Sequence, residues 1–150
     1  SERRTDIVAQ EAVRALRQAG PVWTVLRLHP KQDRAEETAL AALFDQVSQS
    51  EPALDLCIAA DLVCGMTSVL LVEAAALGLP VLSIVPQAAE REWLGDAGEA
   101  IPSVSTRAAL EGWLVGPWLP TRLDRATGSA LDRMVGAIAA ATGTEVSHAL

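Results

Sequence analysis

The sequence predicts an α/β fold with a mostly parallel sheet and helices on both of its faces. Stretches with helical spacing of apolar residues alternate with short runs of β-branched residues, and this order requires crossover connections between parallel strands. The chain has 150 residues, 50% of them hydrophobic, which is enough to bury the core of one domain. Only 3% are aromatic, so Ala, Leu and Val fill the interior. We therefore expect residues 1–150 to form a single domain.

The first half of the chain begins with a predicted helix over residues 5–19, which Gly20-Pro21 ends. Residues 22–28, "VWTVLRL", are rich in β-branched residues between two prolines and predict a buried strand. Residues 35–49 have helical spacing again. Residues 53–60 are ambiguous, and we expect a short helix or turn because the next strand follows at once.

The second half contains the strand "DLVCG" and the helix "SVLLVEAAALG", in which Ser68 is the expected N-cap and Gly78 the stop. The strand "PVLSIV" follows. Residues 86–104 are expected to be irregular. A capped helix over 105–115, a break at "GPWLP" and a final helix near 121–142 complete the chain.

An open α/β domain usually starts with a strand, whereas this chain opens with a polar loop and a helix. We expect a preceding strand either to lie upstream of Ser1 or to be absent. The sequence is thus expected to be a fragment of a longer, two-domain protein.

Charge and composition exclude several classes of protein. The net charge of −7 disfavours nucleic acid and anionic membranes as partners, so any phosphate contact must be local. Cys57 and Cys64 lie in apolar surroundings without a matching His or Cys cluster, which argues against zinc and fits a reducing, cytoplasmic location. Asp61 and Glu73 interrupt the only long apolar run, so no transmembrane segment is predicted. No signal peptide is predicted either.

Candidate site residues follow the predicted strands, because ligands of parallel α/β sheets bind outside the carboxyl ends of the strands. They are Arg27, His29 and Lys31 after the first strand, Gly65, Met66, Thr67 and Ser68 after the second, and residues 86–92 after the third.

Each candidate has two interpretations. Thr67 and Ser68 open a helix whose free amides could bind phosphate, or Ser68 is simply a helix cap. Glu73 could bind the hydroxyls of a ribose, or it faces solvent. His29 could donate to a phosphate or act as an acid or base, or it is a structural loop residue.

The segment "AADLVCGMTSVLLVEAAALGLPVLSIVP" resembles the C-terminal, nucleotide-binding half of enzymes with the GT-B fold, which has a Rossmann-like open sheet. It is similar to the "aaDlvi…sG…EaaalGkPvl" pattern of nucleotide-sugar glycosyltransferases and UDP-N-acetylglucosamine 2-epimerases. "LRLHP" is similar to the His-Pro motif of bacterial sialyltransferases and polyol-phosphate transferases. The likeness covers about residues 5–115, and residues 55–86 carry most of the motif.

The resemblance implies a role for each candidate. The loop at Gly65, Thr67 and Ser68 receives the phosphates, and Glu73 holds the ribose. His29 contacts the phosphate as the expected catalytic residue, helped by Arg27 or Lys31. Glu90 and Arg91 lie near the place where the epimerases have a Glu-Arg pair beside the nucleotide. Many UDP-sugar enzymes have Gly-Gly or Gly-Ala in place of Thr67-Ser68, so CMP- and CDP-linked donors stay open beside UDP.

The predicted function is therefore to bind the nucleotide-sugar donor of a GT-B glycosyltransferase, without a cofactor or metal. The acceptor-binding domain lies outside this chain, so the isolated domain is expected to be inactive. A 2-epimerase is the alternative enzyme, and a non-catalytic binding or assembly module is the alternative of another class. The sequence leaves a homodimer open.

Overall fold

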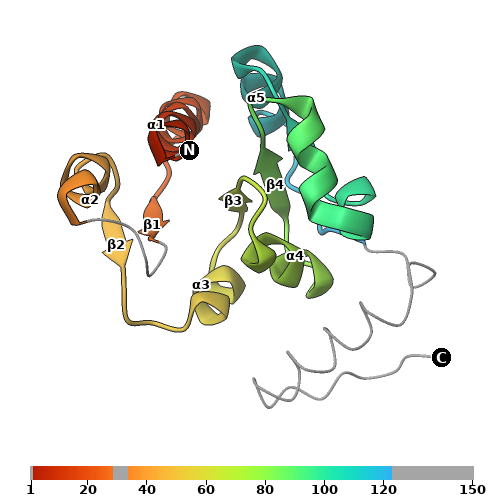
Figure 1. The fold of residues 1–150 in the computed structure, drawn as a ribbon, viewed down its shortest axis with the longest axis horizontal. Coiled ribbons are helices and arrows are strands. Elements are labelled where there is room, and N and C mark those ends of the chain that lie inside the picture. The colour runs from red at the N-terminus through yellow and green to blue at the C-terminus, as the bar shows by residue number, and fades with distance from the viewer. Residues whose placement is uncertain (1, 29–33, 123–150) are drawn as a thin grey trace.

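The computed structural model of the protein describes residues 2–28 and 34–122. Its helices are α1 (Glu2–Ala19), α2 (Arg34–Ala41), α3 (Ala53–Ala59), α4 (Val69–Ala76) and α5 (Arg107–Leu114), and a 3-10 helix, η1, spans Ala88–Glu99. The strands are β1 (Val25–Arg27), β2 (Gln46–Ser48), β3 (Val63–Gly65), β4 (Val81–Ile84) and β5 (Ser103–Val104). Helices and strands alternate along the chain (Figure 1), which confirms the predicted α/β class.

Every strand pair in the described part of the chain is parallel, as predicted. β1 pairs with β2, with Leu26 opposite Val47. β4 lies between β3 and β5, with Leu82 opposite Cys64 and Ile84 opposite Val104. The described strands therefore form two small sheets of order β1-β2 and β3-β4-β5, where the sequence predicted one open sheet.

The core covers both faces of the three-stranded sheet, which confirms the prediction of helices on both faces. On one face α1 and α5 pack against β4 and β5 through Val8, Ala12, Ala15, Leu82, Ile84, Val104, Leu110 and Leu114. On the other face α3, α4 and η1 pack together through Cys57, Leu71, Ala74, Ala75, Val81, Leu94, Ala97 and Ile101. All four residues of β4 are buried, as expected for a central parallel strand.

The predicted helices over residues 5–19, 68–78 and 105–115 are confirmed as α1, α4 and α5. Residues 53–60, for which the sequence left a short helix or a turn open, contain the short helix α3. Gly78 ends α4 as expected, because its φ of 77° lies in the left-handed region that glycine adopts at little cost. The predicted final helix, near 121–142, falls almost wholly outside the described residues. No helix in the described ranges is both long and apolar enough to cross a membrane.

The prediction of one helix over residues 35–49 is wrong beyond Ala41. The helix ends there, and residues 46–48 form β2 instead. The amides of Asp45 and Gln46 both donate to the Thr24 carbonyl at 3.1 Å, so a partner 21 residues away fixes this segment as a strand. The spacing of apolar residues within the segment does not reveal that distant contact.

The prediction that residues 86–104 are irregular is also wrong in part. They contain η1, which opens with a capping box between Gln87 and Glu90, and the two-residue strand β5. The Ser83 amide donates to the Pro102 carbonyl at 2.8 Å, and the Val85 amide donates to the Val104 carbonyl at 2.9 Å. β5 is too short for a two-residue alternation to stand out in the sequence.

Asp45 ties the start of β2 to the start of β1. Its Oδ2 accepts hydrogen bonds from the Thr24 amide and the Thr24 hydroxyl, both at 2.7 Å, and Arg17 lies 3.6 Å from Oδ1. These contacts, the amide bond first, hold the pKa of Asp45 below its ordinary value of 3.8.

We expect acid to weaken this junction. Because the folded pKa of Asp45 is depressed, its contribution to stability is fully present well above pH 3.8 and is lost as the pH falls through the folded value. The unfolding free energy of the wild type, measured by urea titration, should therefore fall between about pH 5.5 and pH 3. In Asp45→Asn it should fall by less over the same range, because the titrating group is gone. The exposed Asp96, replaced by Asn, is the control and should keep the wild-type slope. Equal slopes for all three proteins would contradict this assignment.

Candidate functional site

The turn from β3 into α4 lies at the carboxyl end of the three-stranded sheet, where the sequence placed the phosphate loop. Gly65 ends β3, and Ser68 caps α4. The hydroxyl of Ser83, which is fully buried in β4, donates to the Met66 carbonyl at 2.6 Å. The neighbouring strand thereby holds the loop in place.

The start of α4 is capped by its own side chain. The Leu71 amide donates to the Ser68 hydroxyl at 3.3 Å, so the helix-cap interpretation of Ser68 is confirmed. The amides of Val69 and Leu70 follow the cap, in the first turn of the helix, where backbone donors have no intrahelical acceptor. Ser68 is exposed and Thr67 half-buried, so this corner is open to solvent.

Two further N-termini open at the same edge of the sheet. η1 begins at Gln87, after β4, and α5 begins at Thr106, after β5, where the Thr106 hydroxyl accepts from the Ala109 amide at 3.1 Å. Parallel strands bring the following helix starts to one side, so the positive ends of their dipoles face the same region.

Ser68 can be tested as a cap and as a phosphate contact separately. Ser68→Ala removes the cap and should lower the free energy of unfolding by about 0.5–2 kcal/mol in urea titrations. Ser68→Asp keeps an acceptor for the Leu71 amide and should unfold like the wild type, within about 0.5 kcal/mol. If Ser68→Ala is as stable as the wild type, the cap does not stabilise α4.

Glu73 lies in the second turn of α4, on a helix whose other residues are Val, Leu and Ala. Its side chain is half-buried, and among the described residues no basic group pairs with it. Burial first, and the negative charge of the nearby Glu73 second, raise the pKa of the Cys57 thiol in α3. The Glu73 oxygens are not among the described buried atoms that lack a partner, so solvent reaches them.

Arg27 ends β1 at the predicted edge but is engaged with β2. Its Nη1 donates to the Ser48 hydroxyl at 2.9 Å and to the Glu51 carbonyl at 2.7 Å. The buried Ser48 hydroxyl donates in turn to Glu51 Oε2 at 2.7 Å, and this bond is the first cause of the lowered pKa of Glu51. The described contacts therefore join Arg27 to the end of β2, and none joins it to Thr67 or Ser68.

Arg91 braces η1 internally. Its Nε and Nη2 donate to the Gly98 carbonyl at 2.9 and 2.6 Å. Gly98 also lets two turns of η1 approach closely, since a Cβ there would lie 3.2 Å from the Arg91 carbonyl oxygen and 3.3 Å from the Leu94 Cβ. Glu90 is buried, and its Oε2 accepts from the Gln87 amide at 3.4 Å. The described contacts of Glu90 and Arg91 thus stabilise η1 itself.

The remaining candidates, His29 and Lys31, lie outside the described residues. Sequence reasoning missed Ser48, Glu51 and Ser83, which hold Arg27 and the Met66 loop. A serine within an otherwise apolar strand, as in "PVLSIV", was the available signal for Ser83, because a buried hydroxyl needs a partner.

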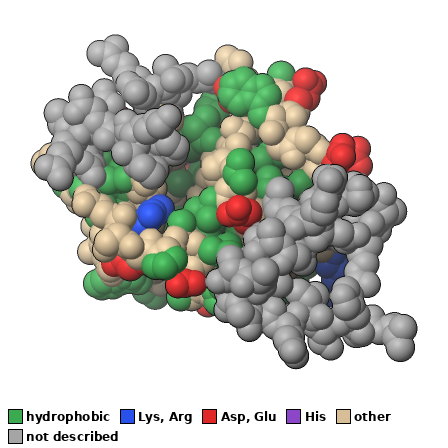
Figure 2. All heavy atoms as spheres, turned by 60° about the horizontal axis from the view of Figure 1, so that its bottom comes forward, with side chains coloured by type: hydrophobic (Ala, Val, Ile, Leu, Met, Phe, Trp, Pro, Cys, Tyr) green, Lys and Arg blue, Asp and Glu red, His purple; other side chains and the backbone are tan. Residues whose placement is uncertain are grey.

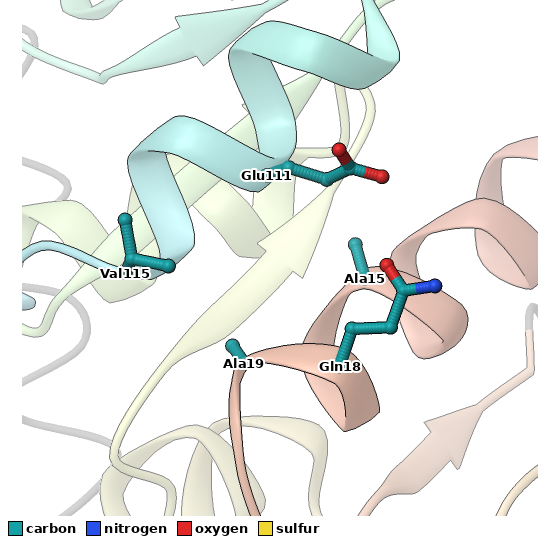
Figure 3. A pocket seen from close by; sticks show the side chains of 5 residues that line it. All are labelled: Ala15, Gln18, Ala19, Glu111 and Val115. Atoms are coloured by element: carbon teal, nitrogen blue, oxygen red, sulfur yellow. The ribbon is translucent and has the colours of Figure 1, made fainter.

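A small hollow lies between the last turns of α1 and α5 (Figure 3), with a volume of about 120 Å³. Its lining residues are Ala15, Gln18, Ala19, Glu111 and Val115. Ligand pockets usually measure about 300–1,000 Å³, so this hollow is too small for a nucleotide. It also lies at the ends of the two helices, whereas the loop at Thr67 lies at the start of α4.

The described surface offers little general attraction for anions. Figure 2 shows acidic side chains at more places than basic ones on the described part of one face, in line with the net charge of −7. Within the described ranges no group of His, Cys, Asp and Glu is arranged to hold a metal ion. Among the described residues at the β3–α4 turn, the groups that could contact a phosphate are backbone amides and the hydroxyls of Thr67 and Ser68.

Comparison of the chain with protein-family models, with curated proteins and with solved structures finds no match.

Proposed function

We propose that the chain is the donor-binding domain of a GT-B-type glycosyltransferase, which holds the diphosphate and ribose of a nucleotide sugar. The observation that carries the proposal is the corner between β3 and α4. There a glycine-ended strand, an exposed capped helix start and a half-buried carboxylate follow one another within nine residues, Gly65 to Glu73. Their order and spacing also support the likeness to nucleotide-sugar enzymes.

The chemistry of the corner suits a diphosphate. The amides of Val69 and Leu70 and the positive end of the α4 dipole would stabilise the charge that develops on the leaving nucleotide. The Thr67 hydroxyl would add a donor. The overall negative charge of the chain makes such local donors necessary.

Glu73 suits the ribose. A carboxylate accepts hydrogen bonds from a pair of neighbouring hydroxyls, and these would supply the donors that the half-buried Glu73 lacks among the described residues. Binding of this kind positions the donor, which is how a domain of this class contributes to transfer.

One observation favours a second candidate, a non-catalytic binding or assembly module of the same fold. Arg27 and Arg91 both donate to oxygen atoms of their own chain, so neither points a free guanidinium at the β3–α4 corner.

Isothermal titration calorimetry with a UDP-, a CMP- and a CDP-linked sugar tests the proposal. We expect one donor class to bind the wild type, and Ser68→Asp to lose that binding, because the added charge repels phosphate while the cap is kept. Ser68→Ala is the uncharged control and should retain binding within about tenfold. If no donor class binds at millimolar concentration, the module is the better description.

A further inference from the structure

Strands β1 and β3 are each paired along one edge only in the described part of the chain. The Val63 amide donates to the Pro80 carbonyl at 3.0 Å, toward β4, so the N–H and C=O of the next residue, Cys64, point to the opposite edge. The Thr24 carbonyl accepts from Gln46, toward β2, so the N–H and C=O of Val25 point away from β2 in the same manner. Two rows of backbone donors and acceptors are thus left without a strand.

β1 and β3 have the apolar sequences that are typical of central strands, but their side chains are exposed to the degree that is typical of edge strands. "VWTVLRL" and "DLVCG" are apolar runs of the kind found where both sheet faces are covered. Yet Val25 is 41% exposed and Cys64 is exposed, while every residue of β4 is buried.

The connections identify the missing neighbour. Within residues 2–28 and 34–122, four strand–helix–strand units follow one another, with α2, α3, α4 and η1 as their crossovers. α1 has the place of a fifth crossover, since it packs on the face of β4 and β5 and then leads into β1. The described residues contain no strand before it. Across Figure 1 the strands follow in the order β2, β1, β3, β4, and α1 lies between α2 and α5 above the interval from β1 to β3.

We propose that one further strand, joined directly to the N-terminal end of α1, lies between β1 and β3 and pairs with both. It would be apolar on both faces, about five residues long, and connected to α1 by about two to six residues. The two small sheets then become one, of order β2-β1-new-β3-β4-β5, which is the order of a doubly wound sheet.

The new strand would stand where the strand order reverses, with β1 and β2 following on one side and β3 to β5 on the other. In doubly wound sheets the ligand crevice opens at this point, outside the carboxyl ends of the strands. The turn from Gly65 to Ser68 borders it through β3. This consequence for the ligand site rests on the proposed function, whereas the strand itself does not.

The test compares three proteins: the 150-residue chain, the chain extended before Ser1 by five Val and Ile residues and a short Gly-Ser loop, and a matched extension with alternate strand residues replaced by proline. Amide hydrogen exchange at Val25 and Cys64 is measured by NMR without nucleotide. We expect exchange to slow by about tenfold or more only with the all-aliphatic extension. The Val63 amide, already bonded to β4, is the internal control and should change little.

Thiol alkylation at alkaline pH gives a second readout, because Cys64 is exposed and Cys57 is buried. The high pH is needed because desolvation raises the pKa of the Cys64 thiol to about 12, and only the thiolate is alkylated. The aliphatic extension should slow modification of Cys64 and leave Cys57 unreactive. The proposal is overturned if the aliphatic and proline extensions behave alike. It is also overturned if both amides are already protected in the unextended chain at every protein concentration. Protection that appears only at high protein concentration overturns it too, because it would show that the free edges pair with a second copy of the chain. Protection without nucleotide binding would refute the proposed function and leave the strand intact.

Discussion

Leu71→Ala is expected to lower the free energy of unfolding by about 2–5 kcal/mol, the largest effect that we predict for stability. Leu71 is 1% exposed and belongs to the cluster of α3, α4 and η1 on one face of the sheet. Its removal leaves a cavity beneath the first turn of α4, where the Leu71 amide also meets the Ser68 cap. Urea unfolding monitored by circular dichroism measures the change.

Val69→Ala is the matched control for Leu71→Ala, because Val69 opens the same helix but is 66% exposed. It should change the free energy of unfolding by no more than about 0.5 kcal/mol. If both substitutions cost the same, α4 is not packed against the sheet through Leu71, and the description of this core is wrong.

Glu73→Gln is expected to weaken nucleotide-sugar binding by about tenfold or more, the largest effect that we predict for function. Hydrogen bonds to a charged group contribute about 1.5–3 kcal/mol, and a tenfold change in affinity corresponds to about 1.4 kcal/mol. The unfolding free energy should not fall, since a half-buried carboxylate without a described cation gains little from its charge.

Glu92→Gln is the control for Glu73→Gln. It makes the same chemical change on η1, where the side chain is exposed, and should leave affinity within about twofold. Calorimetric titration of both variants decides between the two interpretations of Glu73. Equal affinities for the wild type and Glu73→Gln would show that the carboxylate does not hold the ribose.

Local signals in the sequence predicted most of the helices correctly. Ser68 and Gly78 bound α4 as their chemistry requires, and the apolar run "PVLSIV" forms the buried strand β4. These elements depend on caps, stops and composition within a few residues, which a single sequence displays.

The elements that the sequence did not predict depend on distant partners. β2 forms because Thr24 binds Asp45 and Gln46, and β5 forms because it pairs with β4. The same reason explains the site. The position of Arg27 at a strand end was predictable, but its bonds to Ser48 and Glu51 depend on which strand lies beside β1. The division into two sheets likewise depends on strand neighbours, which periodicity does not specify.

NMR titration of the ¹⁵N-labelled chain with UDP-, CMP- and CDP-sugars tests most directly whether the β3–α4 corner binds a nucleotide sugar. We expect the largest shifts at the amides of residues 67–71, and we expect them to saturate with one donor class. Shifts confined to the hollow between α1 and α5, or no shifts at any residue, would contradict it.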